Sequence, residues 1–133
     1  MVRAYHQCEA LLSARLAVHG LRLAEHEILV NLQVEPGISQ QVLAVRCFAA
    51  KSGVSMLITR MENDGLVRRE TDGDDGRAKR LMLTRKGEKL AAKCLAVQSE
   101  IVNAMAATLT AKELGQLEVQ MLRLSARIVI MTE

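Results

Sequence analysis

KSGVSMLITRMENDGLVRRET, residues 51–71, changes its hydrophobic period partway along. Its apolar residues first recur at helical spacing, which predicts a helix over residues 51–64. That stripe consists of Val54, Leu57, Ile58 and Met61. Gly65 is expected to end the helix, because glycine adopts the left-handed conformation of a helix C-terminus without strain. Residues 66–71 then have the composition of a short strand, so a helix is expected to lead directly into a strand.

The segment that follows predicts a second strand and a turn. Residues 79–84, KRLMLT, are again strand-like, and residues 72–78, DGDDGRA, separate the two runs. A loop with two glycines and three aspartates between two such runs indicates a β-hairpin. Because an isolated hairpin is only marginally stable, we expect it to lie against the preceding helices.

Three amphipathic helices are expected before this stretch, over about residues 2–18, 24–34 and 40–47. His19-Gly20 ends the first helix. Ser39 is the expected cap of the third helix. The expected apolar face of that third helix comprises Val42, Leu43 and Ala44.

The last third of the chain predicts two longer helices. The first covers about residues 86–108, and its apolar stripe comprises Leu90, Cys94, Val97, Ile101 and Met105 or Ala104. Thr110 and Glu113 then form a capping box. The terminal helix carries a heptad-like seam of Leu114, Leu117, Met121, Leu124, Ile128 and Met131. Leu122, Val129 and Ile130 add apolar surface outside the seam, so we expect a two-fold dimer through the first and last helices.

Composition sets the class of protein. The chain has 133 residues, 50% of them apolar and 25% charged, and its only aromatic residues are Tyr5 and Phe48. We expect one domain over residues 1–133, mainly α with a small β-hairpin. No apolar run approaches the roughly 20 residues that span a bilayer, and the start lacks the apolar stretch of a signal peptide, so a cytoplasmic protein without membrane contact is expected. Three widely spaced cysteines predict reduced thiols.

The net charge of +3 is unevenly distributed. Residues 39–93 hold twelve basic and seven acidic side chains, a net charge of +5, and the remainder of the chain carries −2. A basic central module is typical of proteins that bind a polyanion such as nucleic acid. An ordinary solvated basic face has the same composition, so charge alone leaves both interpretations open.

Seven short motifs follow one another through the middle of the chain. They are His19-Gly20-Leu21, Pro36-Gly37-Ile38-Ser39-Gln40, Leu43-Ala44-x-Arg46, Lys51-Ser52-Gly53-Val54-Ser55, Arg60-Met61-Glu62-x-x-Gly65-Leu66-Val67-Arg68-Arg69, Asp75-x-Arg77-Ala78 and Leu83-Thr84-x-x-Gly87. In this order and spacing they resemble the MarR (multiple antibiotic resistance regulator) family of winged helix-turn-helix transcription regulators. The resemblance implies a homodimer with dimerisation helices at 1–19 and 86–133 and a DNA-binding module at 24–85. It also implies a repressor of a pseudo-palindromic operator on double-stranded DNA.

The resemblance assigns positions on the DNA. The recognition helix is expected in the major groove, with these residues on or beside its exposed face: Lys51, Ser52, Ser55, Met56, Thr59 and Arg60. Ser39 and Gln40 are expected to donate to phosphate at a helix N-terminus. Arg77 is expected in the minor groove with Asp75 holding its guanidinium. Arg68, Lys79 and Arg80 are the expected phosphate contacts, although an ordinary basic hairpin would carry the same residues.

Several positions depart from the family pattern. Met56 stands where many members have arginine, and Gly76 stands where the wing often has a second arginine. Phe48 replaces a common glycine, and Ala50 replaces the usual Ser or Thr cap, a role that Ser52 is expected to take. These departures leave open an alternative function, a winged helix module that contacts only proteins.

The remaining candidates concern small molecules. By resemblance, an effector such as a small aromatic acid is expected, with Arg15 as carboxylate partner and His19 as hydrogen bonder, although both also suit a surface or interface. Cys8 is either an oxidant-sensing thiol or an inert core residue, and no neighbouring basic residue favours the former. His6, His19 and His26 could bind a metal with Glu25 or Glu27, but the helix expected over residues 86–108 offers no histidine, so metal binding is the less favoured interpretation. No cofactor and no enzymatic activity are expected, because no nucleophile–base pair or Gly-rich phosphate loop is present.

Overall fold

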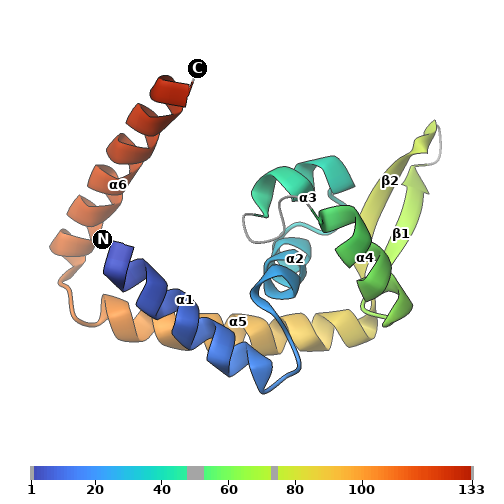
Figure 1. The fold of residues 1–133 in the computed structure, drawn as a ribbon, viewed down its shortest axis with the longest axis horizontal. Coiled ribbons are helices and arrows are strands. Elements are labelled where there is room, and N and C mark those ends of the chain that lie inside the picture. The colour runs from blue at the N-terminus through green and yellow to red at the C-terminus, as the bar shows by residue number, and fades with distance from the viewer. Residues whose placement is uncertain (1, 48–52, 73–74, 133) are drawn as a thin grey trace. The chain divides into compact units, whose positions relative to one another are not determined.

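The computed structural model describes residues 2–47, 53–72 and 75–132, with side chains except at 72, 75–78 and 132 (Figure 1). The elements in chain order are α1 (Val2–Ala17), α2 (Leu23–Val34), α3 (Gln40–Arg46), α4 (Val54–Asn63), β1 (Val67–Asp72), β2 (Asp75–Leu83), α5 (Arg85–Ala106) and α6 (Ala111–Thr132). The chain forms two compact units, Met1–Gln98 and Ser99–Glu133. The predicted class, mainly helical with one small hairpin, is confirmed.

Helix α4 follows the predicted stripe but begins later than expected. Val54, Ile58 and Met61 are buried along one side, as the spacing predicts. The helix starts at Val54, and Gly53 before it is the non-helical N-cap residue. The predicted start at residue 51 is therefore wrong. Ser52, the expected cap, lies outside the described residues.

The end of α4 has the expected geometry. Gly65 has φ +72°, and the Leu66 amide donates to the Met61 carbonyl oxygen at 2.9 Å. This bond spans the six-residue loop of a Schellman motif, which turns the chain from the helix into β1.

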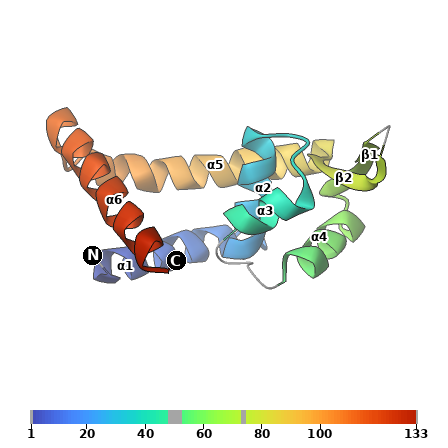
Figure 2. The ribbon, with the colours of Figure 1, turned by 90° about the horizontal axis from the view of Figure 1, so that it is seen from above.

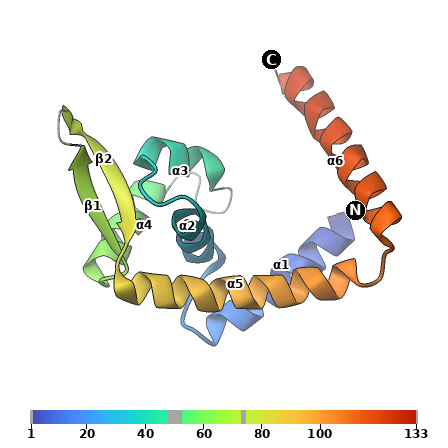
Figure 3. The same ribbon diagram turned by 180° about the vertical axis from the view of Figure 1, so that it is seen from behind.

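The β1–β2 hairpin is antiparallel, as predicted, but its loop is shorter than residues 72–78 (Figure 3). β2 already begins at Asp75, and the register of the described pairs shifts between Thr71 and Asp72. Glycine and aspartate indicate that a turn is present but not where it ends, because strand pairing uses backbone groups that these residues also have. The predicted loop over residues 72–78 was therefore too long.

A short segment before α3 joins the other side of β2. Gly37 donates its amide to the Leu81 carbonyl oxygen at 2.9 Å, and the Leu81 amide donates to Ile38 at 3.1 Å. Ser39 pairs with Arg80 in an isolated antiparallel bridge. This pairing cannot be read from the sequence, since a three-residue segment is too short to show alternation.

The unit Met1–Gln98 contains the hydrophobic core. Helix α2 contacts α1, α3 and β2, while the hairpin and α4 lie at the N-terminal end of α5 (Figure 2). The core residues come from every element of this unit: Leu16, Leu21, Ile28, Leu29, Leu32, Ile38, Leu43, Cys47, Val54, Ile58, Met61, Leu66, Val67, Leu81, Leu83, Ala91 and Cys94. Val42 is 42% exposed, so its predicted place on the apolar face of α3 is wrong. The fully buried Leu43 and the partly buried Ala44 pack this short helix against the core.

The unit Ser99–Glu133 buries little. Thr110 and Glu113 form the predicted capping box, with the Glu113 amide donating to Thr110 Oγ1 at 3.2 Å and the Thr110 amide donating to Glu113 Oε2 at 2.7 Å. These bonds lower the pKa of the Glu113 carboxyl. The buried stripe of α5 ends at Ile101, because Met105 and Ala104 are exposed. Within the described ranges, no helix is both long and apolar enough to cross a membrane.

Candidate nucleic-acid interface

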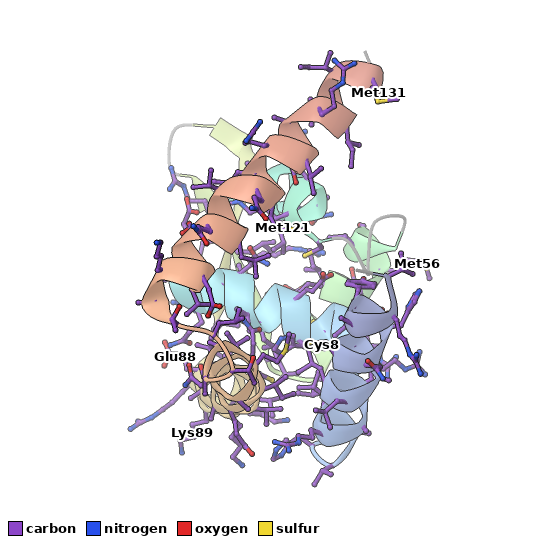
Figure 4. All side chains as sticks on the ribbon, turned by 90° about the vertical axis from the view of Figure 1, so that its left-hand side faces the viewer. Cys8, Met56, Glu88, Lys89, Met121 and Met131 are labelled. Atoms are coloured by element: carbon purple, nitrogen blue, oxygen red, sulfur yellow. The ribbon has the colours of Figure 1, made fainter. Side chains whose placement is uncertain are left out.

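The exposed edge of α4 carries the residues expected there. Ser55, Met56, Thr59 and Arg60 are all solvent-exposed, on the side opposite the buried stripe. Met56 is 82% exposed and projects from α4 in Figure 4. Lys51 and Ser52 lie outside the described residues. The described part of α4 therefore offers small polar groups with one flexible apolar side chain among them.

Ser39 caps α3 as predicted. Its backbone is extended (φ −71°, ψ 155°), and its Oγ accepts from the Val42 amide at 3.2 Å. This bond uses the hydroxyl as an acceptor and leaves its proton for another partner. Gln40, the first residue of α3, is half-buried.

The bridge to β2 brings Arg80 to the same place. Arg80 is exposed, and its Nη1 atom lies 4.0 Å from where a Cβ of Gly37 would stand. Its guanidinium thus lies over the segment that precedes Ser39. Two expected phosphate contacts, 41 positions apart in the sequence, are neighbours because residues 37–39 pair with β2.

The charged residues of the hairpin are divided between its two faces. Arg68 and Arg80 share one face, and on it Arg68 pairs with Glu70, which lies directly opposite Arg80. Lys79 is exposed on the other face, opposite Thr71. The backbones of Asp75 and Arg77 belong to β2, but their side chains are outside the described set.

Arg69 is a polar residue of this surface that the sequence analysis did not select. Its Nη2 donates to Thr59 Oγ1 at 3.2 Å, and its Nη1 lies 3.1 Å from Glu62 Oε2. Thr59 Oγ1 in turn donates to the Ser55 carbonyl oxygen at 3.0 Å. The alternation of β1, which puts Arg69 on the same face as buried Val67, could have identified it.

A cavity of about 510 Å³ lies in the same unit, away from α4 and the hairpin. Its lining comes from α1, α2 and α5: Tyr5, Cys8, Glu9, Leu12, Leu23, His26, Glu27 and Gln98. Figure 4 shows Cys8 on the side of α1 that faces the other helices. Arg15 in the last turn of α1 is half-buried, and His19 is exposed in the turn after it; neither lines this cavity.

His26 is a buried polar residue in the lining of this cavity. It is buried, its Nε2 lies 2.8 Å from Gln98 Oε1, and its Nδ1 has no partner among the described groups. Burial lowers the pKa of His26 from 6.5, against the raising effects of Gln98 and Glu27. Neutral imidazole therefore links α2 to α5.

The candidate metal ligands and thiols differ in their surroundings. His6 lies 3.6 Å from Glu9 on α1, and no group of three His, Cys, Asp or Glu suited to a metal occurs within the described part of the chain. Cys47 and Cys94 are buried, which raises the pKa of each thiol to about 11. Both are therefore unreactive near neutral pH. Cys8 is half-buried at the cavity.

Comparisons with known proteins agree with this geometry. A family model described as MarR family matches residues 19–78. The transcriptional regulator HosA of Escherichia coli O157:H7 is 30% identical over 126 residues, covering 91% of this chain and 93% of HosA.

Two solved structures have the same fold. A MarR-family transcriptional regulator from Silicibacter pomeroyi aligns with a TM-score of 0.81 and 25% identity, over 95% of this chain and 85% of that one. Staphylococcus aureus MepR in complex with DNA aligns with a TM-score of 0.83 and 20% identity, over 94% of this chain and 93% of MepR.

Proposed function

Because this chain belongs to the MarR family, and is thus a transcriptional regulator rather than an enzyme, we propose that it is a homodimeric repressor of a pseudo-palindromic operator. The observation that carries the proposal is the exposed polar edge of α4 beside a basic hairpin. A helix with small polar residues on its outer edge can approach base edges closely.

In this proposal α4 enters the major groove. Ser55, Met56, Thr59 and Arg60 face the bases, with Lys51 and Ser52 just before them. The exposed Met56 side chain suits contact with a thymine methyl group, since it is largely apolar and its thioether sulfur is only a weak hydrogen-bond acceptor.

The hairpin and the start of α3 hold the phosphates. Ser39 and Arg80 lie side by side, and with Gln40 they form one proposed phosphate contact. Arg68 and Lys79 supply further charge from the two faces of the hairpin. Arg77 with Asp75 is the proposed minor-groove contact, carried over from the family resemblance.

Dimerisation supplies the second half-site. The seam of α6, from Leu114 to Met131, is exposed throughout the single chain. A second copy that covers it would present two α4 helices to two half-sites, because protein two-fold symmetry is mirrored in a pseudo-palindromic operator.

Effector release is the last part of the proposal. A cavity of about 510 Å³ is large enough for a small aromatic molecule. Glu9 and Glu27 line it, so the acidic group of an effector would have to lie outside this lining; Arg15 and His19, at the C-terminal end of α1, are the proposed partners there. An oxidant acting at Cys8 is the second route to release.

A gel shift on the DNA upstream of the protein's own gene tests DNA binding. We expect the dissociation constant to rise steeply with salt, and Lys79→Ala to lower the slope of log Kd against log salt by about one. Lys112→Ala, the same charge change on α6, is the matched control and should leave the slope unchanged. No binding at any salt concentration would favour the alternative, a module that contacts only proteins.

A further inference from the structure

Arg69 lies in strand β1 of the hairpin, but its side chain contacts α4. Val67, Arg69 and Thr71 alternate along β1 on one face, where Arg69 lies opposite the fully buried Leu81. Because this is the face of β1 that contacts α4, the Arg69 side chain extends onto the helix, and it is only 22% exposed.

Its guanidinium makes two contacts with successive turns of α4. Nη1 lies 3.1 Å from Glu62 Oε2, and Nη2 donates to Thr59 Oγ1 at 3.2 Å. The Nε atom is buried with no partner within the described ranges. A guanidinium held at both ends and partly buried has little freedom to leave, so it fixes the spacing between hairpin and helix.

The same contact determines what the Thr59 hydroxyl can do. A hydroxyl has one proton and two lone pairs. Thr59 Oγ1 gives its proton to the Ser55 carbonyl oxygen, and one lone pair accepts from Arg69. What remains toward solvent is a single acceptor.

We infer that Arg69 is a positioning residue for DNA recognition: it locks Thr59 as a hydrogen-bond acceptor, so that the base facing Thr59 carries an amino group. In the major groove the amino donors are adenine N6 and cytosine N4, whereas guanine N7 and O6 and thymine O4 only accept. This inference rests on the proposed function, because it requires that α4 enters the major groove.

Selection from a random-sequence duplex library with the full-length protein tests the inference. Wild type should select one base pair at the position of each half-site that Thr59 faces, and replacing the adenine or cytosine of that pair by the analogue that lacks the exocyclic amino group should weaken wild-type binding. Thr59→Val, which keeps the shape and removes the hydroxyl, should lose about fivefold of the preference at that position only. Arg69→Gln should lose the preference at the same position, although Arg69 itself faces no base.

Arg68→Gln is the matched control, since it removes the same charge from the neighbouring residue on the opposite face of β1. It should weaken binding to all sequences about equally and leave the selected base unchanged. If Arg69→Gln behaves in the same way, Arg69 is only a source of charge and the inference is overturned.

Two other results would also overturn it. One is that removing the amino group from the adenine or cytosine of the affected pair leaves wild-type binding unchanged; the other is that Thr59→Val changes no position. Thr59→Val keeps the test decisive even if Arg69→Gln fails to fold, which a thermal melt followed by circular dichroism would show. Failure of the proposed function looks different, because wild type would then select no sequence at all.

Discussion

Both units of this chain contain apolar helix stripes, but the two units use them differently. In Met1–Gln98 the helices and the hairpin cover one another, and every residue of the hydrophobic core cluster that the structure describes belongs to this unit. In Ser99–Glu133 only Ile101 is buried among the described residues, and every side chain described in α6 is exposed, Met121 and Met131 included (Figure 4).

The comparison teaches that an apolar stripe identifies a helix without identifying its partner. The stripe of α4 is covered by its own chain, whereas the seam of α6 has the same periodicity and remains open. A terminal helix with this much exposed apolar surface is typical of an interface. The predictions below test whether the two units differ as the structure indicates.

The largest effect is expected from charging the α6 seam. Burial of a leucine side chain is worth about 1.5–3 kcal/mol, so Leu117→Glu/Leu124→Glu should raise the dimer dissociation constant at least about 100-fold. Sedimentation equilibrium would measure it. Gln116→Glu/Arg123→Gln, which makes the same net charge change away from the seam, is the control. Equal behaviour of the two variants would mean that α6 is not the interface.

A second prediction addresses the dense packing of the first unit. A Cβ atom at Gly87 would stand 2.0 Å from the Leu66 carbonyl oxygen and 3.3 Å from Leu83 Cδ2. The Gly87 amide also donates to Thr84 Oγ1 at 3.0 Å, which fixes the start of α5. Because the obstacle is backbone, Gly87→Ala should destabilise the protein by about 3 kcal/mol. Urea unfolding followed by circular dichroism checks this, and an unchanged midpoint would refute the close contact.

Much of this fold follows from the sequence, because helix periodicity and end signals are local. The stripe of α4, the Gly65 turn and the Thr110–Glu113 capping box all depend on residues within one or two turns. The exposed edge of α4 follows from the same periodicity, since residues opposite a buried stripe face solvent.

What could not be predicted depends on contacts between distant segments. The pairing of residues 37–39 with β2 and the bond between His26 and Gln98 join parts of the chain 41 to 44 and 72 positions apart. His26 is buried on a helix that also buries Glu25 beside three aliphatic residues, and no local pattern marks the partner of His26. Arg69 was missed for a similar reason, because a basic residue in a basic hairpin is assigned to solvent by default.

The third prediction concerns how the free energy of unfolding depends on pH through His26, a residue of the unit Met1–Gln98. Its folded-state pKa lies below the unfolded value of 6.5, so the unfolded chain binds more protons between the two values. The stabilising contribution is complete above pH 6.5 and is lost as the pH falls toward the folded-state pKa. Each pKa unit of difference is worth about 1.4 kcal/mol. Urea unfolding at pH 7.5 and 5.0 should show a smaller loss for His26→Gln than for wild type.

His19→Gln is the control for this measurement, because His19 is an exposed histidine in the turn after α1. It should keep the wild-type loss of stability in acid. If His26→Gln keeps it as well, the acid sensitivity arises from other groups, and His26 is no more than a packed side chain.

The smallest expected effect has the opposite sign and comes from Gly115 in α6. A Cβ atom there would have no neighbour within 4 Å, and alanine favours a helix interior over glycine by about 1 kcal/mol. Gly115→Ala should therefore slow amide hydrogen exchange in α6 about fivefold. The same substitution at Gly87, by contrast, is expected to destabilise the protein. Gly115 follows Leu114 by one residue, about 100° around the helix, and so lies beside the seam. Faster exchange together with a weaker dimer would show that the partner helix approaches this glycine closely, which would extend the interface beyond the seam.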